Sequence, residues 1–485
     1  MSAGVPRLSW LTLSWLTLGA AIASSGCVVS SSGADVSRVR ELTRVPSLPE
    51  VAEIANVDLE LAASENAGKL LAKPLDADAA VRIAILQNRE LRAVLRDVGV
   101  ARGRVLQAGL LPNPLVEAEF VPERDSLLAL RVEYDLKGAV LAPLRARAFA
   151  PELEVARYRA AQGVIELGYQ VRAAVYRVQS TTQRLQIAQR VLDGFAAARD
   201  ATEAMHAAGN VANLERASRE AAYQKARVVV AELELEAANE REDLHQRLGV
   251  FGAQTNWTLA SGLPEAPKTL ALPDALEAAV LRANLAMHET RHELEGLARK
   301  AGVARIDGLL PDLSVDAHAL LTDTQDGTAG GNPRGWRFGA GVTMGLPVFN
   351  RNQGTSLSLE AQFDAGLERY LGAAVELRSE ARKARARVVS AHARARQYQE
   401  VIVPAQRVVT DETLLQYNAM QVGIYQVLAA RREALEVDLA EVEMRREYWT
   451  ARALLDALLA GARPGSGAAP RVRMPASGEQ SAGGH

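Results

Sequence analysis

The stretch LLPDLSVDAHA, residues 309–319, decides how this chain is built. Apolar and polar side chains alternate along its second half, which is the pattern of a β-strand with two different faces. A similar stretch, LLPNPLVEAEF, occupies residues 110–120. The offset between the two prolines, Pro112 and Pro311, is 311 − 112 = 199 residues. The sequence therefore predicts an internal duplication.

Each predicted copy has the same order: a helix, the LLP turn, alternating segments, and then a very long helical stretch. The first copy covers 76–263 and the second covers 274–461, with a linker at 264–273 that contains Pro264 and Pro267. The order of elements predicts a mainly α fold with a small β part.

Four alternating segments are predicted as strands, with apolar side chains on one face and charged side chains on the other. We expect them at 115–122, 127–136, 313–321 and 336–346. Their lengths approach the roughly 9–11 residues with which a tilted strand spans a bilayer. A half-buried sheet in a protein without membrane contact would show a similar pattern. The polar side chains assigned to the water-filled side are Glu117, Glu119, Arg131, Glu133, Asp135, Asp316, His318 and Arg337.

Four strands are too few to close a barrel, because the smallest membrane barrels have about eight. Open strand edges are not tolerated in lipid, so several chains must combine their strands. The sequence therefore predicts a homo-oligomer. Three copies would give a twelve-stranded barrel with a water-filled interior.

The helical stretches are predicted as two antiparallel hairpins, at 144–249 and 355–460. Small apolar residues at three- and four-residue spacing allow close, coiled-coil packing of such helices. A helix of ~60 residues would reach ~90 Å. The breakers that reverse the two hairpins are Gly209-Asn210 and Gly423. Helices alone would also suit a helical envelope scaffold without a pore.

The N-terminus has the features of a secretory signal at 1–26, with Arg7 before an apolar run and small residues before Cys27. Small residues directly before a cysteine resemble a bacterial lipobox, although Ser24 departs from its usual aliphatic residue. The only cysteine of the chain, Cys27, is therefore predicted to carry the lipid. An N-terminal extension at 27–75 precedes the first copy, and the tail at 462–485 is predicted to be disordered.

Charge excludes one class of function. The chain has 56 basic and 58 acidic residues, a net charge of −2, whereas a nucleic-acid binder shows a basic excess or stripe. Aromatic residues make up only 5%, which favours long packed helices over a large compact core. No nucleic-acid partner and no cofactor are predicted.

The segment HETRH raises a zinc-peptidase alternative, because His288, Glu289 and His292 have the H-E-x-x-H spacing. The flanking Arg291 and Glu293 are charged, as expected for an exposed helix face. The chain then passes through the LLP turn into a strand, where a third ligand would need a neighbouring helix. We therefore predict that the chain is not an enzyme, and the metalloprotease remains a minor alternative.

Several motifs together resemble the outer-membrane efflux factor family, the TolC-like proteins, over residues 76–461. They are QNRELRA (87–93), QAGLLPNP (107–114), GLPVFNRNQG (345–354) and YNAMQVGIYQVLAARREAL (417–435). The resemblance implies a homotrimer in the bacterial outer membrane, with a β-barrel in the lipid and an α-helical tunnel in the periplasm. It implies docking to a periplasmic adaptor and an inner-membrane pump, with passive conduction of small solutes such as drugs or metal ions. A valine after Cys27, rather than aspartate, resembles sorting of lipoproteins to the outer membrane.

The resemblance also assigns roles at the ends of the two hairpins. Residues matching the adaptor-contacting tips are Gly209, Asn210, Val211, Val422, Gly423 and Ile424. The alternative is that these residues only form the turns and contact no adaptor. Acidic residues a few positions after the tips form a constriction in relatives, and Glu215 fits this pattern. The second hairpin departs from it, because Arg432 lies in the comparable region. The sequence therefore predicts a mixed constriction of Glu215 and Arg432.

Overall fold

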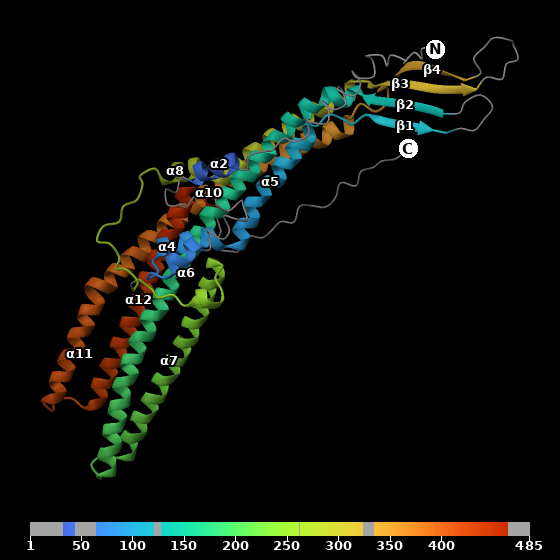
Figure 1. Ribbon diagram of the computed structural model, residues 1–485. Coiled ribbons are helices and arrows are strands. Elements are labelled where there is room, and N and C mark those ends of the chain that lie inside the picture. Colours follow the sequence, from blue (N-terminus) through green and yellow to red (C-terminus); the bar gives the residue numbers. More distant parts are fainter. Residues whose placement is uncertain (1–32, 44–64, 121–127, 261, 324–333, 464–485) are drawn as a thin grey trace, which may run out of the picture.

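A computed structural model describes residues 33–43, 65–120, 128–260, 262–323 and 334–463. Cys27, the signal segment and nearly all of the tail lie outside these residues. The described chain is elongated, with a sheet at one end and two helical hairpins reaching the other (Figure 1). Among the described helices, none is both long enough and apolar enough to cross a membrane.

The sheet has four antiparallel strands in the order β1-β2-β3-β4. The strands are β1 (Leu115–Glu119), β2 (Leu128–Asp135), β3 (Asp312–Asp323) and β4 (Arg334–Gly345). β3 and β4 are longer than the sequence pattern alone suggests, because their pairing continues to Asp323 and Arg334. Within the described chain, β1 and β4 are the two edges of the sheet.

The first copy contributes α4 (Ala77–Gln87), α5 (Arg89–Gly109), α6 (Leu136–Ala207), α7 (Asn213–Leu248) and the short η3 (Gly252–Thr255). The second contributes α8 (Leu276–Ala283), α9 (Leu285–Leu309), α10 (Gln353–Gln397), α11 (Val403–Asn418) and α12 (Ile424–Ala460). A helix before both copies, α2 (Gly33–Thr43), packs on α6. Its buried Asp35 pairs with Arg102 of α5 and Arg157 of α6, which fixes part of the N-terminal extension to the helices.

α6 begins at Leu136, earlier than the expected 144, and continues through Pro143 and Pro151. The Asp135 side chain starts it by accepting a hydrogen bond from the Gly138 backbone N–H. Two internal prolines normally weaken a helix. Pro151 is buried and lies next to Gly296 of α9. Tertiary packing therefore outweighs the local preference.

The second long hairpin is interrupted by a π-helical turn, Tyr398–Ile402, between α10 and α11. It ends two residues before Pro404, which lies at the start of α11 and has no backbone N–H to donate. In a π turn the backbone hydrogen bonds span five residues instead of four, and this local change lets the helical path continue past the proline.

The duplication is visible in two asparagines. The Asn88 side chain caps α5 by accepting from Leu91 N (2.9 Å), and it donates to Arg247 O (3.0 Å). Asn284 does the same in the second copy, accepting from Met287 N (3.0 Å) and donating to Ala462 O (2.9 Å). Each asparagine therefore starts one helix and holds the end of the hairpin that returns beside it.

The core lies between the helices and is built mainly from small and aliphatic side chains. On α10 the buried positions alternate in steps of four and three residues, which is the spacing of a coiled-coil seam. They are Leu377, Ala381, Ala384, Val388, Ala391 and Ala395. Alanine at most of these positions allows α9 and α12 to approach α10 closely.

Candidate functional site: the two-faced sheet and the hairpin tips

The strand register places most polar and most apolar side chains on opposite faces of the sheet. Opposed residues share a face of the sheet, so the pairs Glu117↔Arg131, Arg131↔His318 and Glu133↔Asp316 define a polar face. All eight polar residues selected from the sequence lie on it. The opposite face carries apolar residues along most of its length, including Val132, Val315 and Phe338, and ends in the charged pair Asp323↔Arg334. Phe338 is 81% exposed, so this apolar face has no covering layer in the described chain.

Two glycines of β4 shape the polar face. Gly339 lies opposite His318, and Gly341 lies opposite Asp316. A Cβ atom at either glycine would collide with the facing side chain, so both side chains extend over β4. His318 Nδ1 lies 3.1 Å from Asp316 Oδ2, and Arg131 Nε lies 3.9 Å from the same oxygen. The sequence marked these polar residues but gave no reason to select the glycines.

The first hairpin tip, residues 208–212, connects α6 to α7. Gly209 has φ of 76°, a left-handed conformation that glycine adopts without a steric penalty. The turn is closed by Gly209 N donating to His206 O (2.9 Å) and Asn210 N donating to Met205 O (2.9 Å). The reversal predicted at Gly209-Asn210 therefore coincides with the end of α6.

At the second tip, between α11 and α12, the left-handed residue is Met420 (φ 59°) rather than Gly423. Gly423 is extended (φ −82°, ψ 165°) and precedes the first residue of α12. Any residue can adopt that conformation, so the need for glycine expected at this tip is not found. Met420 is 94% exposed at the end of the hairpin.

Glu215 and Arg432, selected for a constriction, each pair within their own helix. Glu215 accepts from Arg219 Nη2 (3.3 Å), and Arg432 Nε lies 3.7 Å from Glu436 Oε1. Both lie near the hairpin tips, one on α7 and one on α12. Within one chain the structure does not bring them together, so a shared ring would need several copies.

The HETRH segment lies on α9 and is part of the packing between helices. Glu289 is buried and accepts from Arg159 Nε (2.5 Å) and from Arg463 Nη2 (2.6 Å). The rings of His288 and His292 both stack on Tyr158, with centroids 5.6 and 5.4 Å away. Across the described residues, no group of three or more His, Cys, Asp or Glu side chains is placed to hold a metal. The motif joins α6, α9 and the end of the second copy.

Burial in this network raises the pKa values of two glutamates. Burial, and next the negative charge of Glu289, raise the pKa of Glu293 above its ordinary value, although Arg159 pairs with it. Burial also raises the pKa of Glu166, which lies near Arg463. In a lumen or at a tip such shifts could serve gating, but these residues lie within the helical body and act on its stability.

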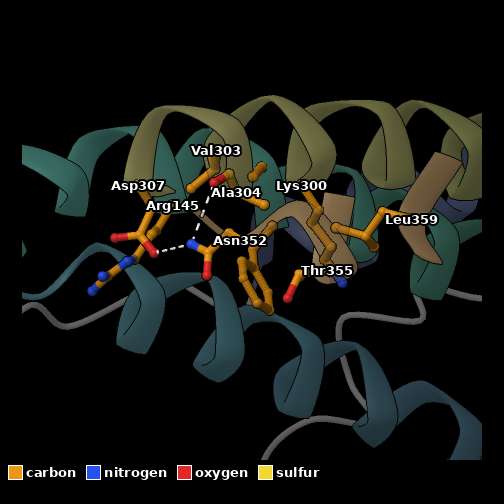
Figure 2. Close-up of a pocket in the computed structure, with 10 residues that line it drawn as sticks. Arg145, Lys300, Val303, Ala304, Asp307, Asn352, Thr355 and Leu359 are labelled. Carbon is orange, nitrogen blue, oxygen red and sulfur yellow. Dashed lines mark hydrogen bonds between the residues drawn. The ribbon is translucent and has the colours of Figure 1, made fainter. Parts of the chain in front are cut away.

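A cavity of 330 Å³ lies where the helices meet the sheet, between α6, α9 and α10 (Figure 2). Its wall includes Phe149, Lys300 and Asn352. As Figure 2 shows, the Asn352 amide donates to Asp307 Oδ2 (2.6 Å) and to Ala304 O (3.3 Å). Asn352 has φ of 56°, so a left-handed asparagine fixes the crossing from β4 into α10. This site acts as a joint between sheet and helices.

Comparison with known proteins agrees with this architecture. No protein-family model matches the chain. It is 25% identical to the cobalt-zinc-cadmium resistance protein CzcC of Cupriavidus metallidurans over 397 residues, which are 80% of this chain and 90% of that protein.

Solved outer-membrane channels share the fold. The channel OprN gives a TM-score of 0.65 at 19% identity, covering 81% of this chain and 92% of that one. CusC gives 0.62 at 18% identity, covering 79% and 91%. The open-state MtrE channel of Neisseria gonorrhoeae gives 0.60 at 17% identity, covering 79% and 88%. The chain therefore shares the fold of solved outer-membrane efflux channels and is similar in sequence, over most of its length, to one outer-membrane efflux factor.

Proposed function

We propose that this chain is the outer-membrane channel of a tripartite efflux system. Three copies combine their sheets into a twelve-stranded barrel, with the apolar face toward lipid and the polar face toward water. Their helical hairpins continue the passage into the periplasm. The observation that carries the proposal is the separation of most apolar from most polar side chains on a sheet whose two edges, β1 and β4, are unpaired in the described chain.

The cargo proposed first is divalent metal cations. The relative CzcC is by name a cobalt-zinc-cadmium resistance protein, and the polar face of the sheet carries more acidic than basic side chains. A permissive tube of this kind would also conduct drugs, which are the second candidate. The channel conducts passively, and the pump supplies both energy and selection.

The hairpin tips are proposed to contact a periplasmic adaptor, which in turn joins an inner-membrane pump. Exposed apolar side chains support this assignment, since Leu214 and Met420 lie at the two tips with most of their surface free. The proposed constriction of Glu215 and Arg432 lies just inside these tips. Cys27, if lipidated, would anchor each copy to the outer membrane in addition to the barrel.

Insertion and conductance test the proposal together. Phe338→Arg places a charge on the apolar face, which in a membrane barrel costs about 2–4 kcal/mol at the bilayer midplane. Thr343→Arg, on the polar face of the same strand, is the matched control. We expect ion conductance in planar bilayers from the native chain and from Thr343→Arg, and little insertion of Phe338→Arg.

A cell-based assay tests the cargo. In a strain that lacks its own channel but retains adaptor and pump, the native chain should restore tolerance to zinc, cobalt or cadmium. A chain that remains monomeric without detergent and gives no conductance would instead support the helical scaffold.

A further inference from the structure

The cavity of 330 Å³ between α6, α9 and α10 combines an apolar wall with a polar rim (Figure 2). Its volume is at the lower end of the roughly 300–1,000 Å³ of small-molecule sites. The helices contribute lining residues three or four positions apart, so the wall is built on helix faces. A wall of this kind fits a hydrocarbon chain. Its apolar residues are Ala148, Phe149, Val303, Ala304 and Leu359.

The pocket lies on the side of the chain that carries the polar face of the sheet. Asp307, one of its lining residues, shares a lysine with β3, because Lys137 Nζ lies 3.1 Å from Asp307 Oδ1 and 2.7 Å from Asp312 Oδ1. Asp312 is four residues before Asp316 on β3, so both side chains are on the polar face. On α6, Lys137 and Ala148 are three helical turns apart and lie on one side of the helix. In the proposed channel, this side faces the water-filled passage.

Two of the charged groups at the rim are already paired. The Asp307 carboxylate binds Lys137, and it also accepts a hydrogen bond from Asn352 Nδ2 (2.6 Å). Lys300 Nζ lies 2.6 Å from Glu152 Oε1. A ligand would have to compete with these contacts in order to bind either group.

Arg145 is the charged rim residue that is left for a ligand. Its side chain is exposed, and it makes no ion pair or hydrogen bond with another described residue. It lies with Asp307 at one end of the pocket, whereas Leu359 lies at the other end (Figure 2). A guanidinium can bind a carboxylate through two parallel hydrogen bonds. An anionic group therefore finds a free partner at this rim, whereas a cationic group finds only a carboxylate that is already neutralised.

We propose that this pocket binds an amphipathic organic anion, with its charged group at Arg145 and its hydrocarbon chain along the apolar wall. The assignment deepens the proposed function, because the place of the pocket in the wall of a passage rests on it. It adds amphipathic anions to the solutes that the passage would meet, beside the metal cations proposed as the first cargo.

Decanoate, a saturated fatty-acid anion, is the probe that tests the pocket. Titration calorimetry of the full-length protein in phosphatidylcholine nanodiscs, corrected with empty nanodiscs, separates binding to the protein from partition into lipid. We expect one saturable site per chain. Arg145→Gln should weaken the affinity about tenfold or more, which is the loss expected for a hydrogen bond to a charged group.

Arg147→Gln is the matched control for Arg145→Gln. Arg147 is exposed on the same helix and does not line the pocket. Its backbone oxygen accepts from Arg299 Nη1 (2.8 Å), and the substitution keeps this contact. The control removes the same charge and should leave decanoate binding unchanged. Equal weakening by both variants would show a general effect of charge and would overturn the site.

Filling the pocket is a second, independent test. Thr355 is exposed and lines the pocket, so Thr355→Trp can occupy the space without displacing a buried residue. We expect this variant to lose saturable binding. Ser358→Trp, at an exposed position of α10 that does not line the pocket, should bind decanoate as the native chain does. Unchanged binding by Thr355→Trp would overturn the pocket as the site.

The sign of the ligand charge is tested with decyltrimethylammonium, which has a similar hydrocarbon chain and a cationic group. The native chain should bind it at least tenfold more weakly than decanoate, and equal affinity would overturn the role of Arg145. The outcomes also separate the two proposals. A native protein that conducts ions but binds no decanoate would overturn the pocket and leave the channel in place. Saturable binding by a protein that does not conduct would overturn the channel and leave the pocket.

Discussion

At the residue scale, the function of HETRH is decided by what its side chains contact. Glu289 binds two guanidinium groups from different parts of the chain, and both histidines stack on Tyr158. The spacing of a zinc site is present, but its central carboxylate is used to join helices. Local spacing is shared by many helices, whereas the partners of a side chain depend on the fold.

The stability of the second copy is expected to depend on one residue, Asn284. Asn284→Ala removes the cap of α9 and leaves the buried Met287 N and Ala462 O without their partner. The expected loss of stability is about 1–3 kcal/mol, from the cap and the unpaired groups. Thermal unfolding in detergent measures it.

Asn284→Asp provides the control, because it keeps the capping oxygen and removes the donor to Ala462 O. The stability of Asn284→Asp at neutral pH should lie between that of the native chain and that of Asn284→Ala. Equal loss for both variants would show that the cap contributes little.

Glu293 is expected to make stability depend on pH. Burial and the charge of Glu289 raise its pKa, so the folded chain binds this proton more strongly than the unfolded chain does. Stability from this group is therefore greatest below the ordinary glutamate pKa and falls as pH rises through the raised value. Glu293→Gln should flatten that decline in a series of unfolding temperatures measured upward from about pH 4.

The exposed Glu90→Gln on α5 is the control for Glu293→Gln and should leave the pH profile as it is in the native chain. A Glu293→Gln profile that falls as steeply as the native one would contradict the assignment.

At the element scale, the strands and hairpins could be predicted because their patterns are periodic and long. Alternation located four strands and separated their faces, and the eight polar residues indeed share one face. Helix ends were less predictable. α6 begins earlier than expected because Asp135 caps it and packing tolerates Pro143 and Pro151, neither of which is visible as a pattern.

The features that were missed depend on contacts between distant segments. Asn88 and Asn284 each bind the far end of a hairpin, and Asp35 binds two arginines from different helices. A single sequence gives no signal for such pairs. The turn at the second tip was misjudged for a different reason, since Met420 adopts the strained conformation for which glycine was expected.

The glycines of β4 are expected to limit assembly of the sheet. Gly341→Val would bring a branched side chain into the space of Asp316, and so displace it from His318 and Arg131. We expect less folded trimer, measured by heat-modified mobility in gels. Gly335→Val on the same strand is the control, because nothing lies near a Cβ atom there. Equal assembly of both variants would show that the polar face has room to rearrange.

At the scale of the whole molecule, the polar face predicts the charge selectivity of the proposed channel. The eight polar residues selected from the sequence include five acids and two arginines, which contribute 2 − 5 = −3 per copy when His318 is not counted as charged; Asp312 on the same face is paired with Lys137. Three copies around a narrow passage concentrate this charge, and a ring of acidic groups attracts cations. We expect reversal potentials in a KCl gradient to show preference for potassium over chloride.

Neutralising acids within the barrel should weaken that preference without closing the channel. Glu117→Gln with Glu133→Gln removes two negative charges per copy from the polar face, and both side chains are free of ion pairs in the described chain. Glu90→Gln with Glu242→Gln removes the same charge from exposed helix positions outside the barrel. If the first pair shifts the reversal potential toward zero and the second does not, selectivity lies in the barrel. An equal shift of the reversal potential from both pairs, or no shift from either, would mean that selectivity does not lie in the barrel. The constriction near Glu215 and Arg432 would then be the next region to test.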